Sequence, residues 1–176
     1  MNYFQFYDIP QAFNVDETQV KRKFYELSKT YHPDFYISHT EEKQHEILEL
    51  STVNNKAYQV LSNFSKRLVY MLQLEGHALE GEKYQLPQDF LMEMMDINEA
   101  LMELEFEADA TILDNTQKQI SAVELHLQND LKTFTHQFDS KNTDDKETLL
   151  LKIKDIYYRQ KYLLRIRESL NKFASR

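Results

Sequence analysis

The sequence predicts an all-α fold, and three features of its composition and pattern lead to this prediction. Glycine occurs twice and proline three times in 176 residues, which is fewer turn-forming residues than a strand-rich fold of this size needs. Apolar residues recur in steps of three and four along most of the chain, the spacing of one face of an α-helix. The glycines and prolines lie where this periodicity breaks, so they mark boundaries between helices.

The first long helix is predicted to begin after Asp16 and to stop near His32. Asp16 is a good N-cap residue, and it precedes an apolar stripe formed by Val20, Phe24, Leu27 and Tyr31. Pro33 should end this helix, because its ring fixes its own backbone and crowds the residue before it. A polar loop to about Thr40 is expected to follow.

A second long helix and a shorter third one complete the predicted amino-terminal unit. The second carries apolar residues at helical spacing, at Leu50, Val53, Ala57, Val60 and Leu61. Two stripes of this kind bury each other as an antiparallel hairpin. The shorter helix, around 65–74, should close the unit, which gives a first domain at 1–75.

Residues 76–87 hold both glycines and one proline, and they are predicted to be a linker. Beyond it, a carboxy-terminal three-helix bundle is expected over 88–176. The first helix should span about 88–110, with core positions at Phe90, Met94, Ile97, Leu101, Leu104 and Ala108. The core positions of the second helix are Ile120, Val123, Leu127, Leu131, Phe134 and Phe138. Those of the third helix are Leu149, Ile153, Ile156, Leu163 and Leu170.

Charge is distributed unevenly over the predicted bundle. Residues 89–109 contain eight acidic and no basic residues, whereas 146–172 contain eight basic and three acidic ones. Facing flanks of these two helices are therefore expected to attract each other, although each exposed pair contributes only about 0–1 kcal/mol.

The composition also argues against several classes of function. The chain has no cysteine, so thiolate metal sites and cysteine nucleophiles are excluded. A net charge of −8 argues against sequence-independent binding of nucleic acid, which needs a clustered basic surface. No apolar run approaches the length that spans a bilayer, and the amino terminus lacks the layout of a secretory signal. Because the predicted first domain begins at residue 1, no organelle-targeting segment is expected. We therefore expect a cytoplasmic protein that binds neither nucleic acid nor membrane.

The most informative motif is His32-Pro33-Asp34, in the loop between the first two long helices. A rigid proline turn there would hold a histidine and a carboxylate at the tip of a hairpin. The carboxylate could accept charge-assisted hydrogen bonds from an arginine of a partner. On the preceding helix, basic residues lie opposite the apolar stripe and should form an exposed basic face, which includes Lys21, Arg22 and Lys29.

Residues 20–34 (VKRKFYELSKTYHPD) resemble the second helix and loop of a J domain, the module that stimulates seventy-kilodalton ATPase chaperones. Residues 2–4 (NYF) and 53–61 (VNNKAYQVL), followed by Arg67 and Tyr70, are similar to other helices of that family. The resemblance covers roughly 1–75. It implies that the chaperone-binding residues are His32, Pro33, Asp34, Lys21, Arg22, Tyr25 and Lys29. Phe35 departs from the family, which usually has lysine after the motif, so the contact of that lysine is not carried over to this chain.

Three other interpretations of the motif stay open. His32 and Asp34 could form only a turn, in which proline ends the helix and aspartate caps the loop. A catalytic histidine–aspartate pair is less favoured, because no strand–turn–helix context presents a serine nucleophile. A metal site from His32, His39 and His45 is also disfavoured, because no histidine pair has i,i+4 spacing.

A second surface is predicted on the first helix of the bundle. Opposite the core stripe lie Met92, Asp96, Glu99 and Glu103, with Leu91 and Met95 on the flank. Apolar side chains beside an acidic row suggest a partner surface. The alternative is a solvated face, because single exposed methionines and acidic rows are common on protein surfaces.

Residues 89–95 (DFLMEMM) resemble the start of the bundle in HscB-type co-chaperones of iron–sulfur cluster assembly. In that family this surface binds the IscU-type scaffold protein. The resemblance implies scaffold contacts through Leu91, Met92, Met95, Asp96, Glu99, Glu103 and, from the last helix, Tyr158, with Tyr157 as the alternative. The implied protein is not an enzyme and has no cofactor; it activates a DnaK/HscA-type chaperone and delivers the scaffold to it. A J-domain protein for another client and a helical adaptor without a chaperone role are the alternatives.

Overall fold

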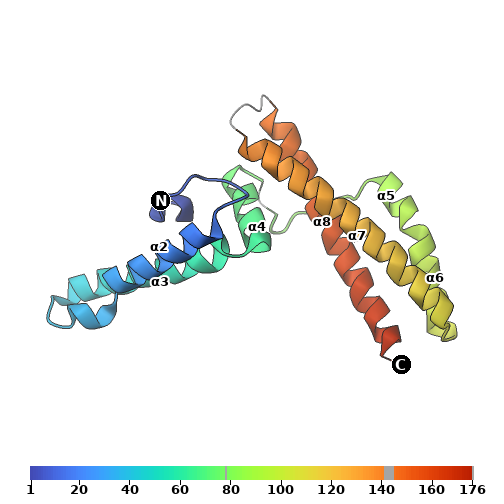
Figure 1. Cartoon of the computed structure of the whole chain (residues 1–176), viewed down its shortest axis with the longest axis horizontal. Helices are drawn as coiled ribbons and strands as arrows, with labels where there is room; N and C mark the ends of the chain where they lie inside the picture. Colours follow the sequence, from blue (N-terminus) through green and yellow to red (C-terminus); the bar gives the residue numbers. More distant parts are fainter. Residues whose placement is uncertain (78, 141–144, 176) are drawn as a thin grey trace. The chain divides into compact units, whose positions relative to one another are not determined.

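The computed structural model describes residues 1–77, 79–140 and 145–175, and within these ranges the chain is helical with no strand. It divides into two compact units, Met1–Glu80 and Gly81–Arg176. Figure 1 shows the course of the chain through both units. The all-α prediction is confirmed, and each unit is described by itself below.

The first unit contains a helical hairpin and two shorter helices. Its elements are α1 (Tyr3–Phe6), α2 (Glu17–Thr30), the 3₁₀ turn η1 (Pro33–Tyr36), α3 (Glu41–Leu61) and α4 (Phe64–Leu74). α2 and α3 pack side by side as the predicted hairpin (Figure 1). The Asp16 side chain accepts hydrogen bonds from the backbone of Thr18 and Gln19, so it caps α2 as expected.

The core of this unit is apolar and partly aromatic. Its buried residues include Phe4, Tyr7, Phe13, Val20, Ile47, Ala57, Leu61, Leu68, Met71 and Leu72. Several expected core residues, Phe24, Leu27, Leu50, Val53 and Val60, are only half-buried. Each fully buried large side chain contributes about 1.5–3 kcal/mol, so this core holds α1 and α4 against the hairpin.

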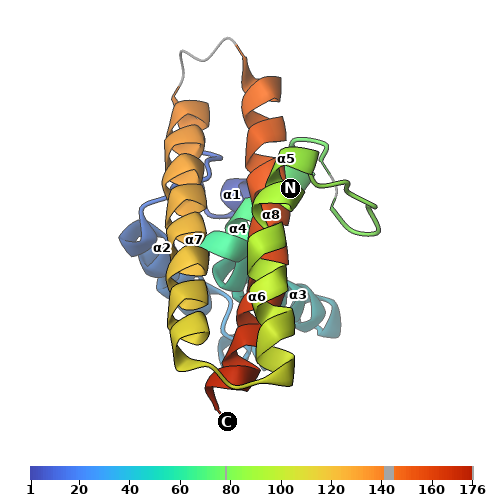
Figure 2. The same cartoon turned by 90° about the vertical axis from the view of Figure 1, so that its right-hand side faces the viewer.

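The second unit is a bundle of long helices. Its elements are α5 (Gln88–Glu93), α6 (Met95–Phe106), α7 (Ala110–Asp139) and α8 (Lys146–Ala174). α5 and α6 meet at Met94, whose backbone keeps right-handed helical dihedral angles. Figure 2 shows α6, α7 and α8 running side by side, which is the expected three-helix arrangement.

The first helix of the bundle ends earlier than its sequence pattern predicted. Ala108 was expected in the core of a helix reaching 110, but α6 ends at Phe106 and Ala108 is exposed. The reason is Asp109, whose side chain accepts hydrogen bonds from the backbone of Thr111 and Ile112 and so begins α7. A residue cannot cap a new helix while it continues the previous one.

The expected charge attraction is made by other residues. Among the described residues, the basic side chains of α8 pair outside their own helix with Glu82, through Lys154 at 2.5 Å, and with Glu124, through Arg167 at 2.6 Å. Neither carboxylate belongs to the acidic stretch 89–109, so that part of the prediction is wrong. The acidic flank of α6 is therefore left facing solvent.

Across the described ranges, no helix is both long and apolar enough to cross a membrane.

Candidate functional site

The loop that carries His32-Pro33-Asp34 lies at the end of the α2–α3 hairpin (Figure 1). Pro33 is the first residue of η1, where its fixed φ suits the turn and its missing N–H costs no hydrogen bond. The Nδ1 atom of His32 accepts a hydrogen bond from the Asp34 backbone N–H over 3.4 Å. The Asp34 side chain is 77% exposed, so its carboxylate faces solvent.

Side chains on both sides of the motif hold its backbone in place. The Tyr36 hydroxyl donates to the Thr30 carbonyl over 2.8 Å, which ties the turn back to the end of α2. The amide of Gln44 on α3 donates to the carbonyls of Ile37 and His39, at 3.0 and 2.9 Å. The exposed motif is thereby ordered before any partner arrives, which lowers the entropy cost of binding.

The basic face predicted on α2 is present. Lys21, Arg22, Tyr25 and Lys29 are all exposed, while Val20 is buried on the opposite side of the helix. Phe35, at the position where related motifs have lysine, is 69% exposed. Its ring centroid lies 5.5 Å from that of His32. The predicted chaperone-binding residues therefore line an exposed surface of α2 and the adjoining turn.

Asn54 is a buried residue to which the sequence analysis gave no role, although it lay in a run that matched the J domain. Its side-chain amide donates to the carbonyl of Phe24 and the hydroxyl of Ser28, both on α2, over 3.1 and 3.0 Å. Its side-chain oxygen accepts from the hydroxyl of Tyr7 over 2.9 Å. Asn54 therefore joins the segment after α1 and the helix α2 to α3, and it fixes the hairpin that presents the motif.

The alternative of a metal site finds no support in the described residues. No group of three or more histidine, aspartate or glutamate side chains is arranged there to hold a metal ion. His32 and Asp34 approach each other only to 3.8 Å, between Nδ1 and Oδ2, and both are open to water. The pair is therefore an exposed feature of the turn that a partner protein can reach.

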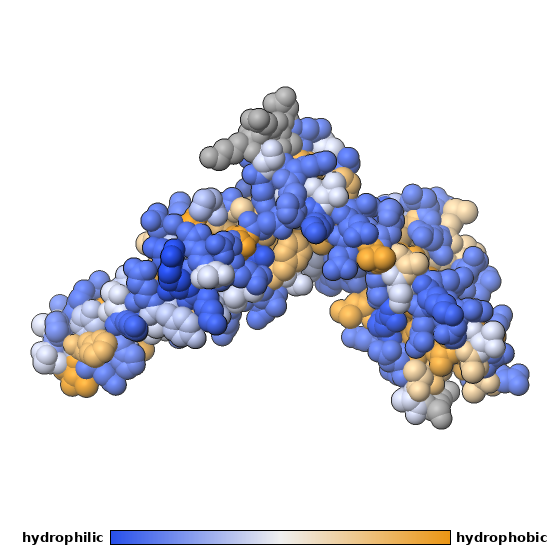
Figure 3. All heavy atoms as spheres, in the orientation of Figure 1, coloured by the Kyte–Doolittle hydropathy of each residue, from blue (hydrophilic) through white to orange (hydrophobic). Residues whose placement is uncertain are grey.

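The second predicted surface lies on α5 and α6. Leu91, Met92 and Met95 are 41%, 62% and 54% exposed. The acidic residues Asp96, Glu99 and Glu103 are exposed on α6 beside them. Figure 3 shows apolar residues interrupting the hydrophilic surface in the region of α5 and α6.

Tyr158 was expected to join this surface from α8. It is half-buried, and it contacts two residues of the segment before α5. Its hydroxyl donates to Glu82 over 2.8 Å, and its ring stacks on Tyr84 with centroids 4.3 Å apart. Burial, and then the hydrogen bond to Glu82, raise the pKa of Tyr158 to about 12. Tyr157 is also half-buried, with the ammonium group of Lys161 5.4 Å from its ring centroid.

Two exposed apolar residues on α6 were missed by the sequence analysis. Met102 is 60% exposed, and Phe106, at the end of the helix, is 89% exposed. Both fall outside the core stripe, and the signal that could have found them was their spacing from Met95.

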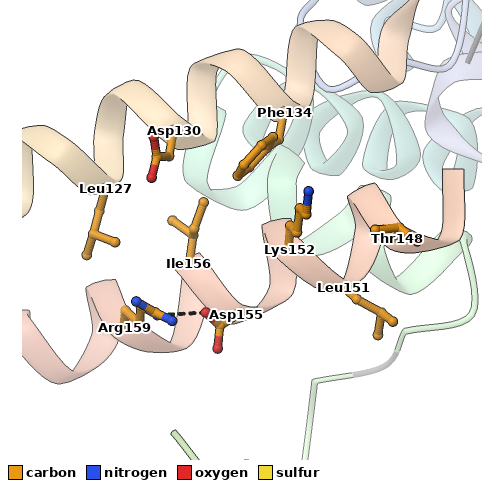
Figure 4. A pocket seen from close by; sticks show the side chains of 9 residues that line it. All are labelled: Leu127, Asp130, Phe134, Thr148, Leu151, Lys152, Asp155, Ile156 and Arg159. Carbon is orange, nitrogen blue, oxygen red and sulfur yellow. Dashed lines mark hydrogen bonds and ion pairs between the residues drawn. The ribbon is translucent and has the colours of Figure 1, made fainter. Parts of the chain in front are cut away.

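A groove of about 410 Å³ runs between α7 and α8 (Figure 4). Its apolar walls include Phe134 and Ile156, and its polar lining includes Asp155 and Arg159. Asp155 accepts hydrogen bonds from both Arg159 and Tyr84, at 2.6 Å each. The Asp155 carboxylate is therefore already engaged by side chains of its own unit.

Two family models match the chain, one for each unit. Residues 2–70 match the DnaJ domain, and residues 86–171 match the domain described as the HSCB C-terminal oligomerisation domain.

Similar proteins were found among characterised sequences. A co-chaperone protein HscB of Buchnera aphidicola is 39% identical over 102 residues, which are 57% of this chain and 59% of that protein. The mouse protein named iron–sulfur cluster co-chaperone protein HscB is 28% identical over 170 residues, 96% of this chain and 67% of that protein. The alignment with the Buchnera relative thus spans less than two thirds of that protein's length.

Solved structures agree on the fold. The chaperone HscB from Vibrio cholerae matches with a TM-score of 0.58 and 25% identity, covering 97% of this chain and 99% of that one. The human co-chaperone HscB matches with a TM-score of 0.69 and 24% identity, covering 97% of this chain and 81% of that one.

Proposed function

This chain belongs to the HscB-type members of the J-domain family, whose two characteristic domains match it in order, and from that premise we propose that it is a co-chaperone of iron–sulfur cluster assembly. In this proposal it stimulates ATP hydrolysis by a DnaK/HscA-type chaperone. It also delivers an IscU-type scaffold protein to that chaperone. Its own residues bind and position partners and carry out no chemical step.

The observation that carries the proposal is the ordered and exposed His32-Pro33-Asp34 turn beside the basic face of α2. A carboxylate that is 77% exposed on an anchored backbone is well placed to accept two hydrogen bonds from a partner guanidinium. Lys21, Arg22 and Lys29 would attract an acidic surface of the chaperone and speed its encounter with the J domain. Tyr25, which is 55% exposed, would add apolar contact on the same helix.

The surface on α5 and α6 is proposed to hold the scaffold. Leu91, Met92 and Met95 would bury apolar area against it, and the acidic residues of α6 would fix orientation through basic partners. Tyr158 is the proposed aromatic contribution from α8. Its exposed part would reach the scaffold, while its bond to Glu82 holds the ring in place.

Delivery follows from having both surfaces on one chain. A scaffold held by the second unit is kept at a high effective concentration near the chaperone that the first unit engages. ATP hydrolysis would then close the chaperone on the scaffold. The cytoplasmic location expected from the sequence belongs to this proposal as well.

The test is single-turnover ATP hydrolysis by a purified HscA-type chaperone, with this chain added alone and together with an apo IscU-type scaffold. We expect stimulation by the chain and a further, synergistic rise with the scaffold. Stimulation of the same size with and without the scaffold would favour a J-domain protein with another client. Failure to stimulate any seventy-kilodalton chaperone would favour the helical adaptor.

A further inference from the structure

We propose that the scaffold-binding surface extends along the whole of α6, through Met102 and Phe106, and that it fits a partner face with an apolar strip bordered by basic residues. This inference rests on the proposed function and adds two residues and a partner chemistry to it. We call Met95, Met102 and Phe106 the outer stripe of α6.

The geometry of the helix places the outer stripe on one line. At about 100° per residue, steps of seven and four put its three members within about 40° of each other. The buried residues Ile97 and Leu104 lie about 180° away, against the bundle. With a rise of about 1.5 Å per residue, the stripe runs for about 16 Å along the helix.

Exposure of the stripe increases along the helix. Its members are 54%, 60% and 89% exposed, from Met95 to Phe106. A bundle helix needs one apolar face for its core, and α6 already has that face. A second apolar line on the opposite side gains nothing from folding, which is the signature of a surface that is buried by a partner.

Charge decides which partner fits. Asp96, Glu99 and Glu103 lie beside the stripe on the same exposed side, and the stretch 89–109 holds eight acidic residues and no basic one. A second copy of this chain docking through the same face would bring two acidic rows together, which is unfavourable. The client scaffold is the partner of the proposed function, so its contact face should be basic around an apolar strip.

The contact can be tested with the full chain and an apo IscU-type scaffold by isothermal titration calorimetry. The variants are Met102→Ser, Phe106→Ser and the two combined. Truncating apolar contacts of this size should weaken binding about tenfold for each single variant and about a hundredfold for the double variant. Leu164→Ser is the matched control, because Leu164 is 59% exposed on α8 and lies outside the stripe. It should bind with the affinity of the unchanged chain.

The possible outcomes separate this inference from the proposed function. If Met92→Ser weakens binding while the double variant binds normally, the surface ends at Met95 and the extension is overturned. If the unchanged chain does not bind the scaffold, the proposed function fails and the extension fails with it. If sedimentation shows a dimer that Phe106→Ser dissociates, the stripe is a self-association surface and the proposal is wrong.

The charge of the partner face is tested by salt. Scaffold binding that does not weaken as the salt concentration rises would overturn the basic partner face. Circular dichroism of each variant checks that the helices are intact.

Discussion

The Asp34 carboxylate is largely surrounded by water, so its charge contributes little to folding and is available to a partner. We predict that Asp34→Asn, which keeps the shape and removes the charge, lowers stimulation of the chaperone's ATPase at least tenfold. The free energy of unfolding should change by less than about 0.5 kcal/mol, as for most exposed positions. Single-turnover hydrolysis and urea unfolding measure the two effects.

Asp8→Asn is the matched control for this variant. Asp8 is also exposed in the first unit, and its φ of 51° is a conformation that asparagine tolerates well. It should stimulate like the unchanged chain. Full stimulation by a folded Asp34→Asn variant would sink the proposed role of the carboxylate.

Asn54 has the opposite character, because it is buried and acts on the fold. Asn54→Ala removes three side-chain hydrogen bonds that link α2, α3 and Tyr7, and it leaves a small cavity. We predict a loss of about 2 kcal/mol in the free energy of unfolding, measured with urea and circular dichroism. The exposed neighbour variant Asn55→Ala should change it little. Equal stability of the two variants would contradict the structural role given to Asn54.

Residues that act through their own exposed chemistry were easier to predict than residues that act through contacts. The exposed positions of His32, Pro33 and Asp34 follow from local turn chemistry, because proline forces the chain out of the helix. The role of Asn54 depends on atoms more than 25 residues away in sequence, so no local pattern could reveal it. The exposure of Phe106 depends on where α6 ends, which a periodic pattern defines poorly.

At the scale of elements, the segment before α5 is fastened to α8 through tyrosines. Glu82 accepts from Tyr158, and Asp155 accepts from Tyr84. The pKa of Tyr158 is raised to about 12, whereas a tyrosine in an unfolded chain has a pKa of about 10. The neutral phenol is thus favoured in the folded state. Its contribution to stability is complete below pH of about 10 and is lost as the pH rises through about 12.

This coupling predicts how Tyr158→Phe behaves with pH. At pH 7 the unchanged chain should unfold at a higher temperature than the variant, because it keeps the hydrogen bond to Glu82. The difference should shrink between about pH 10 and 12, because the phenol of the unfolded chain ionises there while the folded chain still holds it neutral. Thermal unfolding followed by circular dichroism at constant ionic strength tests this. Parallel curves over the whole range would show that Tyr158 is not coupled to folding.

The helices themselves were well predicted, and the errors have a common cause. Proline and capping residues define the ends of α2 correctly, because both act through neighbouring atoms. The end of α6 was placed too late, since the apolar spacing continues through Ala108 while the side chain of Asp109 already caps α7. The two hydrogen bonds to the Asp109 side chain start a new helix at this point, although the apolar spacing alone would continue α6. The charge pattern failed for a similar reason, because the side-chain reach that pairs Lys154 with Glu82 is not visible in sequence spacing.

At the scale of the whole molecule, the chain combines two compact units that carry different surfaces. The first presents the charged turn and the basic face of α2, and the second presents an acidic and apolar face on α5 and α6. Because each unit has its own core, a substitution on one surface should leave the other surface intact.

This independence predicts that Asp34→Asn acts as an inhibitor in a mixture. The variant should bind the apo scaffold like the unchanged chain but fail to engage the chaperone. In excess it would occupy the scaffold, so scaffold-dependent stimulation by the unchanged chain should fall in proportion to the share of scaffold it captures. Adding Phe106→Ser to Asp34→Asn should raise the concentration needed for the same inhibition about tenfold, because Phe106→Ser is expected to weaken scaffold binding about tenfold. Inhibition by the two variants is compared by titrating each into the single-turnover reaction of chaperone, scaffold and unchanged chain. Equal inhibition by both would mean that the two surfaces do not act through separate partners.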